Sequence, residues 1–420
     1  MTYKFLQVIH STAAHYAHYV EKHYDRSRFS VDILNVDETP ESALLERGPD
    51  YDFIHFWVDV KPEILRALRA STKSLISITN GFGDPLPGFK DEPWDTQVHV
   101  TMSAYAKYAR IVGSDTRSLF PRNVVNYLPV DTEAFDPQKV GQASLDRMRS
   151  SLGIRDDDVV ISRTGRPDIW KWDVFPVHVL KKLHEFGIRA KYLVVGGVPS
   201  FLKRELLRKG LYQHVVEVPF ERYKPGVDIR TASILGLSQA YVHSAFIGES
   251  CGMSILEAMS MERPVLVTNK PWADNAPPEY IADGSNGFLC SSVDDCARLM
   301  RRLLLDEKMR QAVGRRARET VVRMFDAAKG TKYFEAMYTT PQNRWNDVLR
   351  PNIDDISRWA EGIAAKRASE AAMRRISQKA LFLAGVRLRR LGQFPALVTL
   401  SNAVHAMPKP RLLRDDELVL

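Results

Sequence analysis

The sequence predicts an α/β protein with two doubly wound domains in tandem, each a mostly parallel sheet covered by helices. Two series of short apolar runs, rich in β-branched and aromatic residues, alternate with segments of helical spacing. A polar, proline-containing stretch at 130–142 separates the two series. Because strands alternate with helices, the strands are expected to be parallel. The length of 420 residues suits two domains of ordinary size.

The first series occupies residues 1–130, the predicted N-terminal domain. Its expected strands are YKFLQVI, SVDILNV, FIHFWV, KSLISI and VHVTMS. Its expected helices are TAAHYAHYVEKHY, PESALLERG, KPEILRALRA and AYAKYARIV. The opening MTYKFLQVIH is interpreted as a buried strand, because it lacks the basic segment and long apolar core of a secretion signal.

The second series occupies residues 131–330, the predicted C-terminal domain. VVISRTG, AKYLVVGG, HVVEVPF, YVHSA and PVLVTN are its expected strands, and 292–325 is expected to be continuously helical. Residues 331–420 are expected to form a crossing helix and a basic helical tail. Ligands of doubly wound sheets bind outside the carboxyl ends of the strands, so a cleft between the two domains is the expected site.

Composition favours a soluble protein of a reducing compartment. The hydrophobic content of 45% and the charged content of 26% are ordinary for a globular protein. No apolar run approaches the roughly 20 residues that cross a bilayer. Three cysteines, Cys251, Cys290 and Cys296, form neither a disulfide framework nor a metal-ligand spacing. We therefore expect a cytoplasmic protein.

The positive charge is concentrated in the C-terminal tail. Between Ser357 and Arg414 there are twelve Lys or Arg and two Glu, a surplus of ten, whereas the whole chain carries +8. Such a stretch suits an anionic membrane surface, a protein partner, an acidic polymer or a solvated helical extension. Nucleic acid is not expected, because the basic residues lack interleaved aromatic side chains.

The stretch GESCGMSILEAM carries the first candidate site residues. Glu249 is expected in a loop, and Gly252 permits a tight turn before a helix that begins near Met253 or Ser254. The free N–H groups and the dipole of that helix start suit phosphate oxygens, and Glu257 lies about one turn inside. The spacing fits a nucleotide-diphosphate sugar, with hydroxyl groups bound by the carboxylates. An ordinary strand–helix turn with a solvated Glu249 is the alternative.

A pair of cations follows the first strand of the second domain in SRTGRPDIWKWDVF. Arg166 and Lys171 stand five positions apart in a loop expected to face the same cleft. Two fixed cations would stabilise the charge that develops on a diphosphate leaving group, without a metal. The alternative is a surface pair beside two tryptophans that pack on the domain.

These motifs together resemble the retaining GT-B glycosyltransferases, in particular family 4, glycosyl transferases group 1. The family's Glu, seven residues, Glu element is similar to E-SCGMSIL-E-AMSMERPVLVTN, and its Gly-Arg…Lys clamp is similar to GRPDIWK. PPEYIADGSNGFL resembles its proline–glutamate and DG-x-NG loop, and NYLPVDTEAFDP resembles its inter-domain segment. The motifs cover residues 123–325, and before them only the architecture is similar.

The resemblance implies roles for these residues and a GT-B fold of two Rossmann-like domains facing across a cleft. Glu249 would hold the transferred sugar, Glu257 would bind the ribose hydroxyls, and Arg166 and Lys171 would bind the diphosphate. The remaining implied contacts come from the backbone of Gly252, Met253 and Ser254, and from the loop around Val218, which would lie against the base.

The first domain departs from the family pattern in two places. Relatives often carry a glycine pair after the first strand, but here the loop reads IHSTAAHYAH, in which Ser11 and Thr12 could donate hydroxyl hydrogen bonds. Many relatives carry His-Gly where this chain has Asn80, which can bind a sugar hydroxyl but cannot act as a base. His15 and His18 lack a Cys or acidic partner in register, so no metal site is expected.

The resemblance implies a metal-independent, retaining hexosyltransferase that needs no cofactor. Its donor would be a nucleotide-diphosphate sugar, with UDP favoured over GDP, and its acceptor a glycan, glycolipid or polysaccharide. Surface polysaccharide or glycoconjugate assembly is the expected setting, with residues 357–414 at the inner face of a membrane as one option. The alternatives are a nucleotide-sugar epimerase or sugar phosphorylase, and a catalytically silent sugar-nucleotide-binding or scaffold protein.

Overall fold

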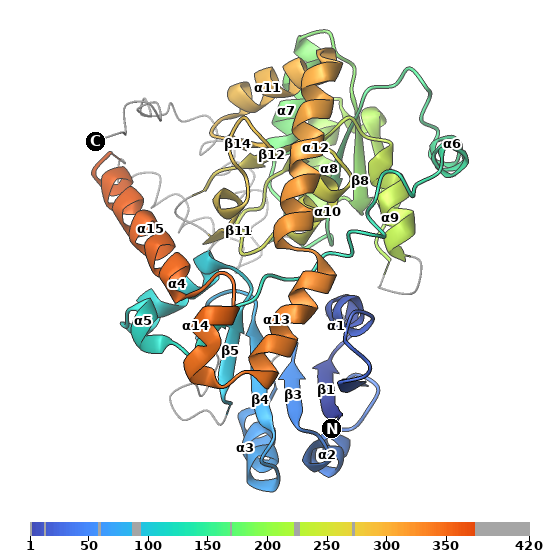
Figure 1. Ribbon diagram of the computed structural model, residues 1–420. Helices are drawn as coiled ribbons and strands as arrows, with labels where there is room; N and C mark the ends of the chain where they lie inside the picture. The colour runs from blue at the N-terminus through green and yellow to red at the C-terminus, as the bar shows by residue number, and fades with distance from the viewer. Residues whose placement is uncertain are drawn as a thin grey trace.

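The computed structural model describes residues 2–11, 14–57, 60–85, 94–168, 170–221, 227–270 and 274–373, with side chains described up to residue 365. Two domains, each built on a six-stranded parallel sheet, lie one above the other in Figure 1. The two doubly wound domains expected from the sequence are confirmed.

The first sheet has the strand order β2-β1-β3-β4-β5-β6. Its strands are β1 (Tyr3–Ile9), β2 (Phe29–Asn35), β3 (Phe53–Phe56), β4 (Leu75–Asn80), β5 (Thr96–His99) and β6 (Asn123–Val125). The apolar runs form these strands because both sheet faces are covered: Phe5, Leu6 and Val8 of β1 are wholly buried.

Helices α1 (Ala14–Glu21), α2 (Glu41–Arg47), α3 (Pro62–Ser71), α4 (Met102–Val112) and α5 (Thr116–Leu119) cover this sheet. Helix α4 has clear capping residues at both ends. The Thr101 side chain accepts a hydrogen bond from the Ala104 N–H at its N-terminus, and Gly113 ends it with φ 72°. The sequence VHVTMS was expected to be all strand, but Thr101 caps a helix there instead.

The second sheet has the order β14-β12-β10-β7-β8-β9. Its strands are β7 (Val160–Thr164), β8 (Lys191–Gly196), β9 (Val215–Pro219), β10 (Ala240–His243), β12 (Val265–Thr268) and β14 (Phe288–Cys290). The short strands β11 (Gly248–Glu249) and β13 (Asp274–Asn275) pair beside it. The helices are α6 (Gln142–Ser151), α7 (Phe175–Glu185), α8 (Ser200–Arg208), α9 (Val227–Gly236), α10 (Met253–Ser260), α11 (Val293–Leu305) and α12 (Glu307–Met324).

Two expectations for the second domain are corrected. Residues 292–325 form two helices, because Asp306 ends α11 and its side chain accepts from the Met309 N–H to begin α12. Glu249 lies in β11 rather than in an irregular loop, and the register pairs it with Asn275.

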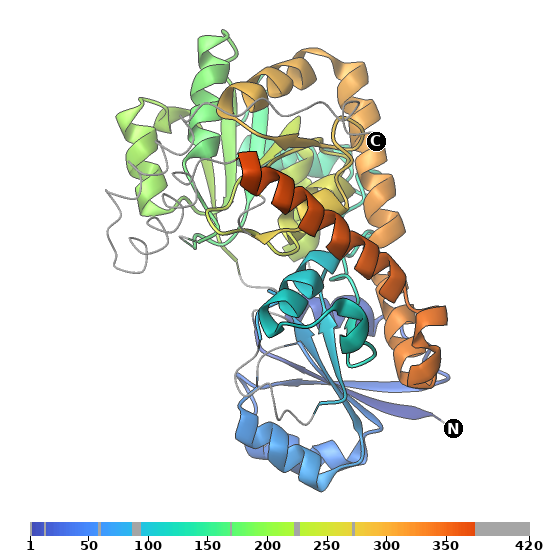
Figure 2. The same cartoon turned by 90° about the vertical axis from the view of Figure 1, so that its left-hand side faces the viewer.

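The C-terminal part returns to the first domain. Helix α13 (Ala327–Thr339) places the Tyr338 ring 4.9 Å from Phe5 and 4.7 Å from Phe53, and the Tyr338 hydroxyl lies 2.8 Å from Ser77 Oγ. After α14 (Trp345–Val348), helix α15 (Ile353–Met373) runs past α4 toward the second domain, as Figure 2 shows. The rest of the predicted tail, residues 374–420, lies outside the described residues.

Candidate active site

A cavity of about 440 Å³ lies between the domains, at the carboxyl ends of both sheets. The loops after β1, β7, β8 and β9 line it, together with α9 and the start of α10. This is the location where doubly wound folds bind ligands. Six residues predicted from the sequence line the cavity, namely Ser11, Arg166, Val218, Met253, Ser254 and Glu257.

The start of α10 forms one wall of this cavity. Gly252 precedes the helix with φ 83°, and a Cβ atom there would lie 2.8 Å from Ile255 Cδ1. The Gly252 carbonyl accepts the N–H groups of Ile255 and Leu256. The N–H groups of Met253 and Ser254 precede the first hydrogen bonds of the helix and have no acceptor within it. Together with the positive end of the helix dipole, they form a binding surface for an anion.

Arg166 adds a cation to the same wall. Its loop is fixed, because the Arg166 carbonyl accepts from Trp172 Nε1 at 2.7 Å. Gly196, with φ 111°, lets the neighbouring strand approach so closely that a Cβ atom would lie 2.0 Å from the Gly165 oxygen. Burial and then the charge of Arg166 lower the pKa of His15, across the cavity, to about 3. His15 is therefore neutral, and Arg166 offers a positive charge to an anionic ligand.

Three carboxyl groups line the cavity, those of Glu221, Asp228 and Glu257. Burial, and to a smaller extent the charge of Asp228, raise the pKa of Glu257 to about 8. Burial also raises the pKa of Asp228 to about 6, although a hydrogen bond from Tyr19 lowers it. A protonated Glu257 can both donate and accept hydrogen bonds, which suits a pair of vicinal hydroxyl groups.

The buried Glu249 and the half-buried Lys171 form an ion pair beside this cavity. Lys171 Nζ lies 3.0 Å from Glu249 Oε2, and His243 Nε2 lies 3.1 Å from Oε1. Burial opposes ionisation of Glu249, but Lys171 and His243 outweigh it and hold its pKa below the ordinary value. Glu249 is only 7% exposed, so it is not the solvated side chain of the alternative interpretation.

Arg163 connects the ion pair to the cavity. Its guanidinium is buried, lies 4.7 Å from the centre of the Trp172 ring, and donates to the Lys171 carbonyl at 2.9 Å. It also lies 3.4 Å from Ser254 Oγ at the start of α10. Sequence reasoning missed this residue, because an arginine inside a strand carries no signal that it is buried. Asp228 in α9 was also missed, and His15 in α1 was considered only as a metal ligand.

The structure gives two predicted residues of the first domain, Asn80 and Ser11, surroundings other than those expected. The Asn80 side chain accepts from the Phe82 and Gly83 N–H groups and donates to the Asp84 carbonyl, so it shapes its own turn and does not line the cavity. Ser11 lines the cavity, but its hydroxyl donates to Asp37 at 2.6 Å. Thr12 lies outside the described residues.

A contact across the cleft holds α4 against the second domain. Glu279 accepts the N–H groups of Met102 at 3.0 Å and Ser103 at 2.6 Å, which are the first two residues of α4. Burial raises the pKa of Glu279 to about 7, although these hydrogen bonds lower it. The Thr101 hydroxyl donates to the Ser250 carbonyl at 2.9 Å, next to Glu249. The domains are therefore joined close to the ion pair.

Comparisons with known proteins match part of this chain to glycosyltransferases. Residues 146–320 match the family model of glycosyl transferases group 1. The chain is 30% identical over 217 residues to the sulfoquinovosyl transferase SQD2 of Arabidopsis thaliana, covering 50% of this chain and 38% of that protein. It is 32% identical over 166 residues to an N-acetyl-alpha-D-glucosaminyl L-malate synthase of Bacillus anthracis, covering 39% of each. The chain thus spans less than half of each of these relatives.

Solved structures extend the likeness over both domains. A glycosyltransferase from Rickettsia africae superposes with a TM-score of 0.67 at 16% identity, covering 80% of this chain and 98% of that one. HepE of Anabaena, solved with UDP and glucose, superposes with a TM-score of 0.64 at 15% identity. The match covers 81% of this chain and 100% of that one. The fold is GT-B. Among the described residues, none of the helices has both the length and the apolar content to cross a bilayer.

Proposed function

We propose that this protein is a glycosyltransferase that moves a sugar from a nucleotide-diphosphate sugar to a glycan, glycolipid or polysaccharide acceptor. The observation that carries the proposal is the cavity where the start of α10, Arg166 and Glu257 meet between the two sheets. A helix N-terminus and a cation suit a diphosphate, and a carboxyl group one turn away suits ribose hydroxyls. The family match over residues 146–320 supports the same activity.

The donor is placed along this wall. The diphosphate lies at Met253, Ser254 and Arg166, the ribose at Glu257, and the base against the stretch from Val218 to Phe220, which also lines the cavity. We favour a UDP-sugar over a GDP-sugar. HepE, which shares the fold, was solved with UDP and glucose, and this supports the choice.

The sugar is placed at the Lys171–Glu249 pair, and transfer is proposed to retain the anomeric configuration without a metal. The acceptor hydroxyl oxygen bonds to the anomeric carbon as the bond from that carbon to the phosphate oxygen breaks. The departing phosphate oxygen takes the acceptor's proton on the same face. Arg166 and the start of α10 stabilise the diphosphate charge, and Lys171 adds to it once the sugar displaces its contact with Glu249.

An apolar groove on the other side of Glu249 supports an amphiphilic acceptor. A cavity of about 960 Å³ lies between α4 and α15, and Ser250, adjacent to Glu249, is part of its lining. Apolar side chains of both helices line it, including Ala106, Ala109, Trp359 and Ile363. Glycolipid or polysaccharide assembly at the cytoplasmic face of a membrane is the setting that we propose.

A sugar-nucleotide-binding protein without turnover is the second candidate, because Asn80 is engaged in its own turn and Glu249 is already paired with Lys171. Purified protein incubated with UDP-, GDP- and ADP-sugars separates the two. Slow release of UDP from a UDP-sugar supports the transferase. A raised thermal midpoint without nucleotide release supports the silent binder, and no effect of any donor contradicts both.

A further inference from the structure

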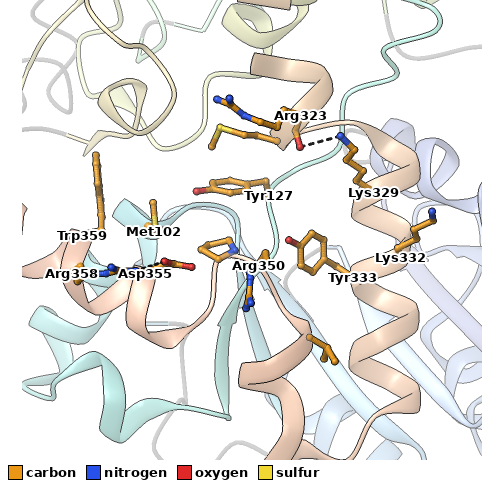
Figure 3. Close-up of a pocket in the computed structure, with 13 residues that line it drawn as sticks. Met102, Tyr127, Arg323, Lys329, Lys332, Tyr333, Arg350, Asp355, Arg358 and Trp359 are labelled. Atoms are coloured by element: carbon orange, nitrogen blue, oxygen red, sulfur yellow. Dashed lines mark hydrogen bonds and ion pairs between the residues drawn. The ribbon is translucent and has the colours of Figure 1, made fainter. Parts of the chain in front are cut away.

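A second interdomain cavity, of about 820 Å³, lies where α12, α13 and α15 meet (Figure 3). We call it the hinge cavity. It is lined by five cationic side chains and one acidic side chain, Asp355, a formal surplus of four positive charges. The cations are Arg323, Lys329, Lys332, Arg350 and Arg358. None of them lines the donor cavity, and Arg358 alone also lines the groove between α4 and α15.

The cations have few acidic partners among the described residues. Arg358 pairs with Asp355 at 2.7 Å, and Lys329 donates to the Val322 carbonyl at the end of α12. Within the part of the chain that the structure describes, Arg323 and Lys332 have no acidic partner within ion-pair distance. The cavity therefore carries a positive charge that the protein itself does not neutralise.

Aromatic side chains form the floor, and the cations stand around the rim. Figure 3 shows Tyr127 in the middle, with Tyr333 and Trp359 on either side. Tyr127 is buried and the other two are half-buried, whereas all five cations are exposed. A single small anion would favour cations that converge on one point. Exposed cations spread around the opening instead suit the many phosphates of a layer of anionic headgroups.

The chain that leaves this cavity is itself basic. Arg358 and Trp359 lie in the first turns of α15, and residues 366–414 that follow carry eleven Lys or Arg and one Glu. Membrane association by one weak signal is marginal, and two signals together give stable attachment. The cavity lining and the sequence of this stretch are therefore two separate cationic signals.

We propose that the hinge cavity is a docking site for the headgroups of an anionic phospholipid leaflet. Its exposed rim cations bind the lipid phosphates at the membrane surface. Docking there is separate from the donor cavity, because the two cavities share no lining residue. Lipid binding can therefore be measured without any transfer activity.

The test is sedimentation of the full-length protein with vesicles of phosphatidylcholine alone or with phosphatidylglycerol. The parent is expected to bind only the anionic vesicles, and Arg323→Glu/Lys332→Glu is expected to bind them at least about tenfold more weakly. The matched control is Arg189→Glu/Arg204→Glu, because these two arginines are also exposed and line none of the cavities described here. A neutral variant, Arg323→Gln/Lys332→Gln, should fall between the parent and the charge-reversed protein.

Three outcomes would overturn the proposal. The first is no binding of the parent to anionic vesicles. The second is equal binding by the parent and by correctly folded Arg323→Glu/Lys332→Glu, because the membrane contact would then be made by the tail and not by the cavity. The third is a thermal shift of the parent by soluble glycerol 3-phosphate without sedimentation on vesicles, which would assign the cavity to a soluble anion.

Discussion

Lys171 Nζ lies 3.0 Å from Glu249 Oε2, and this ion pair links the loop after β7 to the short strand β11. Glu249 is almost fully buried, so its charge depends on Lys171 and on His243 beside it. A charge that loses its partner inside a protein is strongly destabilising. The pair therefore serves the stability of the site as well as the proposed chemistry.

Replacing Lys171 should mainly lower turnover. Lys171→Ala removes a cation proposed to act on the departing diphosphate, and the loss of one such group lowers kcat by roughly 100-fold. The affinity for the donor nucleotide should change far less, because Arg166 and the start of α10 remain. Measured kcat and donor Kd decide this, and a variant with the parent's kcat would remove Lys171 from the mechanism.

Loss of the Lys171 cation should also destabilise the fold unless Glu249 is changed too. Lys171→Met leaves the buried Glu249 carboxylate without its cation, at a cost of about 3–5 kcal/mol of unfolding free energy. Lys171→Met/Glu249→Gln should recover much of that loss. Urea unfolding of the two single variants and the double variant measures the coupling, and strictly additive effects would mean that the pair does not interact.

Glu257→Ala should weaken nucleotide binding. The variant loses a carboxyl group that lines the cavity and is placed against the ribose hydroxyls, and about 1–3 kcal/mol of binding free energy should be lost. Glu257→Gln, which keeps the hydrogen-bonding shape, should retain more affinity. Titration with UDP checks both variants, and affinity equal to the parent's in Glu257→Ala would place the ribose elsewhere.

Glu257 should also make stability depend on pH. Its pKa in the folded protein is about 8, above the ordinary 4.5, so the folded state holds a proton that the unfolded state releases. The parent should lose stability as pH rises from about 4.5 to about 8. Glu257→Gln should lose less over that interval. Thermal midpoints of both proteins measure this, and parallel pH profiles would contradict the raised pKa.

Arg163→Lys should preserve the charge but lose the forked contacts. Arg163 donates to Lys171, lies near Ser254 and covers Trp172, and a lysine cannot reproduce this geometry. We expect lower stability and weaker UDP binding, with the overall fold kept. Arg189→Lys, at an exposed position, is the matched control. UDP titration and denaturant unfolding check the pair, and unchanged affinity in Arg163→Lys would make its role purely structural.

Long apolar runs predicted the sheets well, and very short strands escaped prediction. The run YKFLQVI matches β1 residue for residue, because burial on both faces of a parallel strand leaves a continuous apolar signal. Strands β6 and β14 have only three residues each, and the two-residue β11 exists only through its pairing with β13. No local pattern distinguishes such strands from loops.

The candidate site was predictable where its residues follow a strand end. Arg166, Met253, Ser254 and Glu257 meet in one cavity because their loops lie at the carboxyl ends of neighbouring strands. The positions of the other site residues depend on tertiary contacts. Asn80 turns into its own loop, and Asp228 reaches the cavity from α9, which follows residues outside the described ranges. The spacing of residues along the sequence predicts neither of these two positions.

A crystal structure of the protein with bound UDP tests the central claim most directly. We predict the diphosphate against the N–H groups of Met253 and Ser254 with Arg166 beside it, and the ribose hydroxyls at Glu257. UDP bound outside this cavity, or bound there with Arg166 and Glu257 turned away from it, would contradict the proposed donor site.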